Sequence, residues 1–431
     1  MMYKFKDSTM MMILLVCSII LITTLFLQNR STGKKSNTPK SPPRFPLIGN
    51  LHQLGRHPHR SLCSLSHRYG PLMLLHFGRV PVLVVSSADA ARDVLKTHDR
   101  VFASRPWTKI TEKLLYNGRD VASAPYGEYW RQMKSVCVVH LLSNKMVRSF
   151  RDVREEEISL MIEKIRESSS LPLNLSKLLV SLTNDVICRV ALGKKYGCET
   201  DFKELTERQL KKTGNDFDEF LEKVLDDHVD GDRDGTDFVD VLLTIQRDKS
   251  VGFQLDRLSI KAIILDVFVG ATDTSYTLME WVMTELLRHR ECLNKLQEEV
   301  RTICNGRSSV LEEDIQDMKY LKAVIKETLR LHPPLPLMAP HESTHDVRLR
   351  EYDIPAGTQD FELIPFGAGR RICPAISFAV VLNEVVLATL VHQFDWRLPV
   401  ESTEDQTNVA ESTGLAIHRM FPLYAIASSS T

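Results

Sequence analysis

Hydrophobic and polar residues follow helical spacing over most of the chain. Apolar side chains recur every three or four positions, which predicts helices, over residues 89–98, 151–168, 175–192, 317–331 and 376–391. The longest such run, residues 259–288, has apolar residues on more than one face. We therefore expect a mainly α fold around one central, buried helix.

Strand-like patterns are few. Residues 69–87 alternate weakly around Gly70-Pro71 and Gly78 and predict a hairpin, and residues 347–354 predict a short strand. No internal repeat and no linker-like break divides residues 51–431. We expect this body to form a single large helical domain with a small β portion.

The N-terminal segment predicts a membrane anchor. Residues 8–29 carry no charge, and a helix of this length spans roughly 33 Å, enough to cross one hydrocarbon core. Residues 30–50 form a basic, proline-rich strap, whose charge places the body in the cytosol by the positive-inside rule. A cleaved signal peptide is the alternative, but no small-residue cleavage site follows the apolar run.

Composition and charge exclude several classes of protein. The chain has 431 residues, of which 43% are hydrophobic and 26% charged, a composition too apolar for a disordered chain. Its 55 lysines and arginines balance 55 aspartates and glutamates, so no overall basic field exists to hold a nucleic acid. Eight cysteines without a CxxC pair argue against structural zinc and a secreted disulfide framework.

Three motifs that suggest metal or nucleotide binding are weak in their context. Residues 341–345 match HExxH, whose histidines converge on zinc only from a helix, but the surrounding prolines and alternation predict extended backbone. Residues 230–235 begin like an EF-hand loop, but Val241 stands where a bidentate Glu is needed, which favours a solvated acidic loop. The GxGxxG that starts at Gly367 has Ile372 in place of its third glycine.

The segment FGAGRRICPA at residues 366–375 favours a metal-containing cofactor. Two glycines and two arginines precede Cys373, and an apolar helix follows it. A thiolate at a helix N-terminus is stabilised by the helix dipole and the free amides, and neighbouring arginines lower its pKa. Glycines allow a flat cofactor to approach the backbone, and an arginine can pair with a carboxylate. A buried structural cysteine would explain Cys373 but not the residues around it.

This segment resembles the signature FxxGxRxCxG of the cytochromes P-450, the haem-thiolate monooxygenases. Four residues match it, with Ala375 at the final glycine: Phe366, Gly369, Arg371 and Cys373. Further motifs agree in the expected order, namely Trp130 and Lys134 for WxxxR, residues 270–275 for AGxDT[TS], and Glu327 and Arg330 for ExxR. The wording of residues 102–106, 124–134 and 365–374 is similar to the plant A-type (71A-like) microsomal enzymes.

The resemblance implies the cytochrome P-450 fold, haem b as cofactor and Cys373 as the axial ligand of the iron. It implies oxidation of a small lipophilic secondary metabolite with O2 and with electrons from NADPH, delivered by a reductase at the endoplasmic reticulum membrane. Cofactor-binding roles would fall to Trp130, Lys134, Phe366, Gly369, Arg371 and Cys373. Glu327 and Arg330 would be structural.

Two residues of the central helix suggest how the reaction would be served. The hydroxyl of Thr274 can donate to the carbonyl of Gly270, which loosens the helix and opens a small polar groove. Asp273 beside it would supply a proton path. We therefore take Asp273 and Thr274 as candidate catalytic residues.

The chain departs from the family pattern in two places. Between Lys195 and Phe220 it is shorter than the family's lid region, and between Gln359 and Asp360 it lacks the meander whose PxRF-type Arg pairs with the ExxR. His341 also replaces an Arg that the family directs at a haem propionate. A buried ExxR pair without its partner would cost roughly 3–5 kcal/mol. The alternative function is therefore a membrane-anchored relic or splice product that does not retain haem.

A local group of cations suggests where an acidic electron donor would bind. We expect this basic cluster to steer such a donor, although a solvated helix face is the alternative. Its members are Arg131, Lys134, Lys145, Arg148, Arg151 and Arg154.

Overall fold

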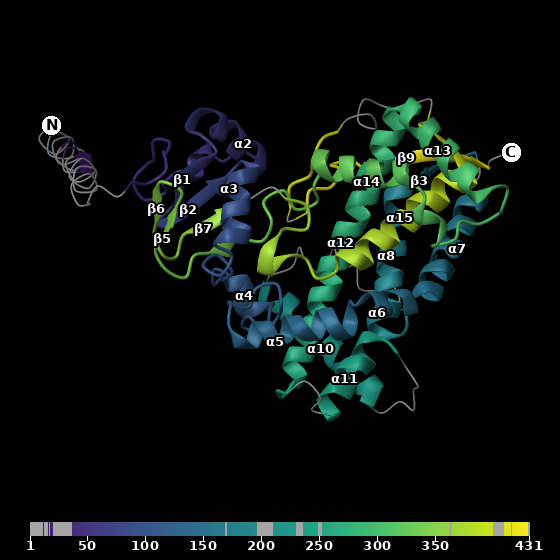
Figure 1. The fold of residues 1–431 in the computed structure, drawn as a ribbon, viewed down its shortest axis with the longest axis horizontal. Helices are drawn as coiled ribbons and strands as arrows, with labels where there is room; N and C mark the ends of the chain where they lie inside the picture. The colour runs from purple at the N-terminus through teal and green to yellow at the C-terminus, as the bar shows by residue number, and fades with distance from the viewer. Residues whose placement is uncertain are drawn as a thin grey trace, which may run out of the picture. The chain divides into compact units, whose positions relative to one another are not determined.

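The computed structural model describes residues 12, 16, 18, 19, 37–168, 170–195, 210–229, 236–248, 252–361, 364–399, 409–414 and 416–429. The chain forms two compact units (Figure 1). The first comprises Met1–Ser104 and Pro340–Leu363, and the second comprises Arg105–Ala339 and Ile364–Thr431. The predicted anchor lies outside the described residues except for four helical positions, and the predicted acidic loop at 230–235 lies outside them entirely.

The first unit contains a four-stranded sheet in the order β1-β2-β7-β4. β1 and β2 form the predicted antiparallel hairpin, and Gly78 at its turn has a φ of 62°, which glycine adopts without strain. β7 pairs parallel with β2 and antiparallel with β4. The helices and strands of this unit are α2 (Pro58–Tyr69), β1 (Leu72–Phe77), β2 (Val80–Val85), α3 (Ala88–Arg92), β4 (His341–Glu342), β5 (Val347–Leu349), β6 (Tyr352–Ile354) and β7 (Gln359–Phe361).

Two predictions concern this unit. The HExxH segment begins in strand β4, so its predicted extended backbone is confirmed, and the buried His341 ring lies 2.8 Å from the carbonyl oxygen of Phe102. Residues 347–354 differ from the prediction of one strand. They form the antiparallel hairpin β5-β6, because the chain reverses where Arg350 takes a positive φ of 56°.

The second unit is helical, with a three-stranded sheet in the order β3-β9-β8. Its helices and strands are α4 (Lys109–Lys113), α5 (Glu128–Val136), α6 (Asn144–Ser149), α7 (Arg151–Glu167), β3 (Pro172–Asn174), α8 (Leu175–Leu192), α10 (Leu210–Val229), α11 (Phe238–Asp248), α12 (Arg257–Arg288), α13 (Arg290–Cys304), α14 (Lys319–Leu331), α15 (Ile376–Gln393), β8 (Phe394–Arg397) and β9 (Tyr424–Ser429).

Helix α12 is the predicted central helix of this unit. Asp256 caps it by accepting a hydrogen bond from the amide of Ser259 at 2.8 Å, and α8, α14 and α15 pack along it (Figure 1). Among the described residues, α12 and α15 are long and apolar enough to cross a membrane. Their packing in the core accounts for that apolarity, because half of each apolar stretch is buried within the unit.

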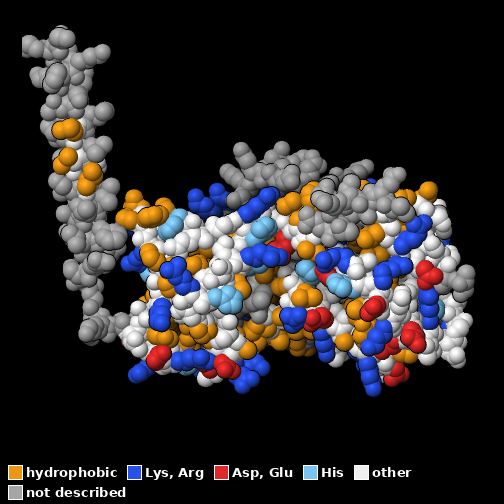
Figure 2. Space-filling model, turned by 90° about the horizontal axis from the view of Figure 1, so that it is seen from above, with side chains coloured by type: hydrophobic (Ala, Val, Ile, Leu, Met, Phe, Trp, Pro, Cys, Tyr) orange, Lys and Arg blue, Asp and Glu red, His pale blue; other side chains and the backbone are white. Residues whose placement is uncertain are grey.

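The visible surface mixes charge signs and apolar side chains. On the face in Figure 2, lysines and arginines are interspersed with apolar residues and with aspartates and glutamates. This distribution agrees with the zero net charge of the chain.

Candidate active site

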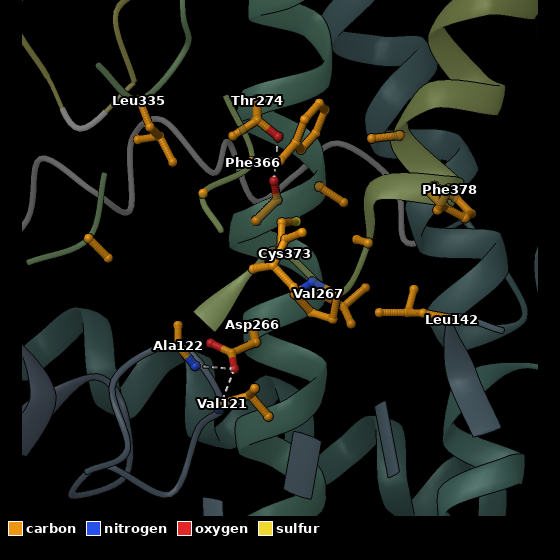
Figure 3. A pocket seen from close by; sticks show the side chains of 18 of the residues that line it. Val121, Ala122, Leu142, Asp266, Val267, Thr274, Leu335, Phe366, Cys373 and Phe378 are labelled. Atoms are coloured by element: carbon orange, nitrogen blue, oxygen red, sulfur yellow. Dashed lines mark hydrogen bonds between the residues drawn. The ribbon is translucent and has the colours of Figure 1, made fainter. Parts of the chain in front are cut away.

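A cavity of about 330 Å³ lies within the helical unit. Its walls come from α5, α12 and α15, together with the loops that precede α5, follow α14 and precede α15. Most lining side chains are apolar, and Figure 3 shows Leu142, Val267 and Phe378 among them. Such a cavity suits a largely apolar molecule that is held by a few polar groups.

Cys373 lies on the wall of this cavity, two residues before the cap of α15 (Figure 3). Burial raises the pKa of its thiol, whereas the backbone amide of Ala375 and the ammonium of Lys134 lower that pKa. The helix start acts in the expected direction, but burial outweighs it and the net shift of the Cys373 pKa is upward, opposite to the prediction. The expected help from the neighbouring arginines is not what acts on the thiol, because the cation that lowers its pKa is Lys134.

The loop before Cys373 turns sharply. Phe366, Gly367 and Gly369 all have positive φ angles, of 63°, 66° and 64°, and the carbonyl of Phe366 accepts a hydrogen bond from the amide of Cys373 at 2.9 Å. Phe366 and Gly367 line the cavity, whereas Gly369 does not. Gly369 thus serves the loop conformation rather than contact with a ligand.

Two predicted cofactor-binding cations meet on the indole of Trp130, which is 4% exposed and lines the cavity. The Arg371 guanidinium lies 4.2 Å from the centroid of the Trp130 ring. The Lys134 ammonium lies 5.2 Å from the same centroid. The Trp130 Nε1–H donates to the carbonyl of Val121 at 3.0 Å, and Arg371 donates to the same carbonyl at 3.1 Å. Burial and the neighbouring Arg105 lower the pKa of Arg371, yet a guanidinium keeps its charge.

Thr274 and Asp273 are placed differently. The Thr274 hydroxyl donates to the Gly270 carbonyl at 2.6 Å and lines the cavity, which confirms the predicted hydrogen bond. Asp273 is not among the lining residues, and Tyr276 and His418 are its polar neighbours. Burial raises the pKa of Asp273. The structure therefore gives Asp273 no direct contact with the cavity.

The ExxR pair is complete but exposed. Arg330 donates two hydrogen bonds to the carboxylate of Glu327, at 2.7 and 2.8 Å, on helix α14. The side chains are 67% and 56% exposed. The predicted penalty for a buried, unpaired charge does not arise, because neither side chain is buried.

The predicted basic cluster is smaller than its sequence suggests. Arg154 is fully buried and paired with Glu312, and Arg151 binds Glu155 and Glu313. Lys134 faces the cavity. Four exposed cations remain in this region. Arg131 lies on α5, Lys145 and Arg148 lie on α6, and Arg370 lies in the loop before Cys373.

Sequence reasoning missed three charged residues of this site: Arg105, Asp120 and Asp266. Arg105 and Asp266 line the cavity, and Asp120 is fully buried next to it. Their only signal in the sequence is that Asp266 is the single acidic residue in the first half of an otherwise apolar helix. A single charged residue has no motif spacing that would indicate its partners, so its contacts with the loop could not be predicted.

The whole chain is similar to one large family of known proteins. The family model described as Cytochrome P450 matches residues 39–217, 202–361 and 358–419. Cytochrome P450 71A26 of Arabidopsis thaliana is 68% identical over 488 positions, covering 98% of this chain and 100% of the relative. Cytochrome P450 71A22 of the same plant is 67% identical over the same coverage, and cytochrome P450 736A117 of Prunus mume is 48% identical, covering 96% of this chain and 95% of the relative.

The fold agrees with this similarity. A solved zebra fish cytochrome P450 structure with abiraterone superposes with a TM-score of 0.79 at 22% identity, covering 87% of this chain and 100% of that chain. A second structure of the fish protein, with progesterone, gives a TM-score of 0.78. Both share the fold.

The comparisons also show that a relative carries residues that this chain lacks. The alignment with the Arabidopsis relative runs over 488 positions although this chain has 431 residues, so the relative has residues without a counterpart here. The family model breaks near residues 202–217 and again near 358–361. These breaks fall at the two places where the sequence predicts internal deletions.

Proposed function

Because the chain belongs to the cytochrome P450 family of monooxygenases, we propose that it oxidises a small lipophilic secondary metabolite at a thiolate-ligated haem b. In this proposal O2 is the oxidant, and a reductase passes electrons from NADPH. The position of Cys373 on the wall of a mostly apolar cavity carries the proposal. The comparisons do not favour the alternative of a relic without haem.

The residues around Cys373 fit this group. The sulfur is a soft ligand, suited to iron, and Lys134 and the Ala375 amide favour its ionised form. Lys134 has three N–H donors and gives two hydrogen bonds, to the carbonyls of Arg370 and Ile372. Together with Arg371 and Arg105 it brings positive charge to the cavity wall, which suits the carboxylates of a porphyrin.

A bound haem and the side chains of the cavity would have different roles in the reaction. A bound haem would supply redox chemistry that no side chain offers, with electron donation from the thiolate favouring O–O cleavage. The apolar walls would hold the substrate and exclude water. Thr274 would present its hydroxyl to the cavity, and Asp273, whose pKa burial raises, is the adjacent acid on the helix.

We place the protein at the endoplasmic reticulum membrane, with residues 8–29 as a single-pass anchor and the body in the cytosol. The uncharged anchor sequence and the basic strap support this location. The exposed cations Arg131, Lys145, Arg148 and Arg370 support docking of an acidic reductase.

A spectrum of the expressed full-length chain tests the proposal. The fraction of the chain that holds haem should show the red-shifted Soret band of a thiolate ligand in the reduced, CO-bound difference spectrum. Cys373→Ser should abolish this band, because a neutral hydroxyl is a poor iron ligand. Cys137→Ser is the matched control, since this buried cysteine also lines the cavity and should leave the band in place. A wild-type chain without the band would favour the relic, and retention of the band in Cys373→Ser would assign the ligand elsewhere.

A further inference from the structure

Asp266 holds the loop that precedes α5. Its carboxylate oxygen Oδ2 accepts hydrogen bonds from the amides of Val121 at 2.6 Å and Ala122 at 3.1 Å (Figure 3). The side chain comes from α12, about one turn before Gly270, and it lines the cavity. A carboxylate that receives two backbone amides fixes both the position and the direction of the loop.

The loop in turn holds the polar groups of the cavity through its carbonyl oxygens. The Val121 carbonyl accepts hydrogen bonds from Trp130 and Arg371, and the Ala124 carbonyl accepts a second bond from Arg371. The Ala122 carbonyl accepts from Arg105 at 3.0 Å. The amides of the loop therefore point to Asp266, and its carbonyls orient Trp130 and two of the cations.

A second acid completes the arrangement. Asp120 is fully buried and accepts the amide of Ser123 at 2.8 Å, and it lies directly before Val121, whose amide donates to Asp266. Burial raises the pKa of both Asp120 and Asp266.

We propose that Asp266 is a positioning residue of the haem site: it fixes residues 120–124, whose carbonyls set Arg371, Arg105 and Trp130 for the carboxylates of the porphyrin. The inference rests on the proposed function. Asp266 touches no reacting atom in this role. It acts through the backbone of the loop, much as outer residues orient the ligands of a metal.

Two substitutions in the full-length chain separate positioning from bulk stability. Asp266→Ala removes the acceptor of two backbone hydrogen bonds. Amide exchange over residues 119–125 should therefore rise roughly tenfold. Haem transfer to an excess of a haem-scavenging apoprotein should become roughly tenfold faster. Asp266→Asn keeps an oxygen that accepts from both amides, so it should restore both rates to near the wild-type values.

Glu280→Ala is the matched control. Glu280 is another buried acid of α12, which accepts hydrogen bonds from the amide of Arg419 at 3.2 Å and from Ser176, and it does not line the cavity. Its loss should destabilise the protein and raise exchange near Arg419, with residues 119–125 unchanged. This pattern separates a general loss of stability from a local release of the loop.

The outcomes are distinct. A wild-type chain that binds haem while Asp266→Ala shows unchanged loop exchange and haem release overturns the inference and leaves the proposed function standing. Asp266→Asn behaving like Asp266→Ala overturns it too, because the geometry predicts rescue. If the wild-type chain binds no haem, the proposed function fails, and loop exchange alone decides whether Asp266 holds residues 120–124.

Discussion

Thr274 and Asp273 are neighbours in the sequence but serve different sides of α12. Adjacent residues of a helix point about 100° apart, so when Thr274 faces the cavity, Asp273 turns toward Tyr276 and His418. The hydroxyl of Thr274 is already committed as a donor to Gly270 and keeps its lone pairs for a water or a ligand in the cavity. Any proton from Asp273 must pass through this hydroxyl or through water.

We predict that Thr274→Ala retains haem but uncouples NADPH consumption from product formation. The substitution removes the polar group that the cavity face of α12 presents at this turn, so the water that it would hold loses its partner. The ratio of product to NADPH consumed, with peroxide measured in parallel, checks the prediction.

Thr277→Ala is a close control for this experiment. Thr277 also donates back along the helix, to the carbonyl of Asp273 at 2.6 Å, but it is fully buried and does not line the cavity. Its coupling ratio should stay at the wild-type value. If wild type and Thr274→Ala had equal coupling ratios, Thr274 would have no role in the reaction beyond its place in the helix.

A second residue-scale prediction concerns pH. Burial and the neighbouring Asp237 raise the pKa of Asp240 to about 6 from an ordinary value of 3.8. Between these two values the folded chain binds more protons than the unfolded chain, so this group's contribution to stability falls as pH rises through that window. Asp240→Asn should therefore raise the melting temperature more near neutral pH than near pH 4.

The comparison of melting temperatures at the two pH values has a simple control. Asp248→Asn changes an exposed aspartate at the end of the same helix and should leave the pH dependence as it is. An equal effect of Asp240→Asn at both pH values would show that Asp240 does not carry the predicted proton.

The sequence identified the loop around Cys373 better than the site as a whole. The spacing of Phe366, Gly369, Arg371 and Cys373 is local, so a motif captures it. The contacts of Asp266 with Val121 and Ala122 join positions 145 and 144 residues apart, and no local pattern encodes them. The exposure of Glu327 and Arg330 was also invisible, because it depends on what covers α14.

At the scale of elements, long periodic helices were predicted well and short irregular segments were not. The helices over 175–192, 317–331 and 376–391 recur nearly unchanged as α8, α14 and α15, because each buries a continuous apolar face. The chain reversal at Arg350 depends on its positive φ angle, which the residue types in this segment do not predict. A hairpin therefore replaces the single predicted strand.

Helix α7 turns one of its predicted surface cations into a core residue. Arg154 is fully buried, and its guanidinium binds Glu312 at 2.7 and 3.0 Å and the carbonyl of Val147 at 2.7 Å. Arg154→Ala should lower the free energy of unfolding by about 3 kcal/mol, because Glu312 then lacks its partner in a shielded position. Denaturant unfolding checks this value, with the exposed Arg148→Ala expected to stay within about 0.5 kcal/mol of the wild type.

Helices α5 and α6 and the loop before Cys373 yield a prediction about electron transfer. If the exposed cations Arg131, Lys145, Arg148 and Arg370 receive an acidic reductase, the rate of haem reduction should fall as salt rises, since the Debye length is about 8 Å at physiological ionic strength. Stopped-flow reduction measures this rate. Arg148→Glu should slow reduction at low salt and lose its effect at high salt.

The electron-transfer experiment also separates steering from stability. Lys164→Glu reverses a charge on α7 outside this group of cations and should leave the low-salt rate near that of the wild type. Reduction that does not depend on salt would favour the simpler interpretation of a solvated helix face.

At the scale of the molecule, the shortened chain keeps the fold elements that carry the site. The cavity, the Cys373 loop and the α12 face all lie within the helical unit, and the second break of the family model falls in β7 of the other unit. The missing residues would follow Gln359, in the strand that pairs with β2 and β4. No described residue of the cavity wall lies in this strand.

We predict that the chain binds haem poorly, and that inserting the segment of a close 71A relative between Gln359 and Asp360 raises the haem content. The inserted segment would cover the exposed face of α14 and give Arg330 the partner that the family pattern supplies. The ratio of haem to protein after gel filtration, together with the thiolate spectrum, measures the effect. A glycine-serine insertion of equal length should leave the ratio unchanged.

Arg330→Ala sharpens this test, because its effect should depend on the insertion. In the present chain the Glu327–Arg330 pair is exposed, and solvent screens such pairs strongly, so haem content should hardly change. In the chain with the restored segment the same substitution would leave Glu327 covered and unpaired, and haem content should fall again. Stoichiometric haem in the present chain, or an equal loss of haem from Arg330→Ala in both chains, would contradict the importance of the missing segment.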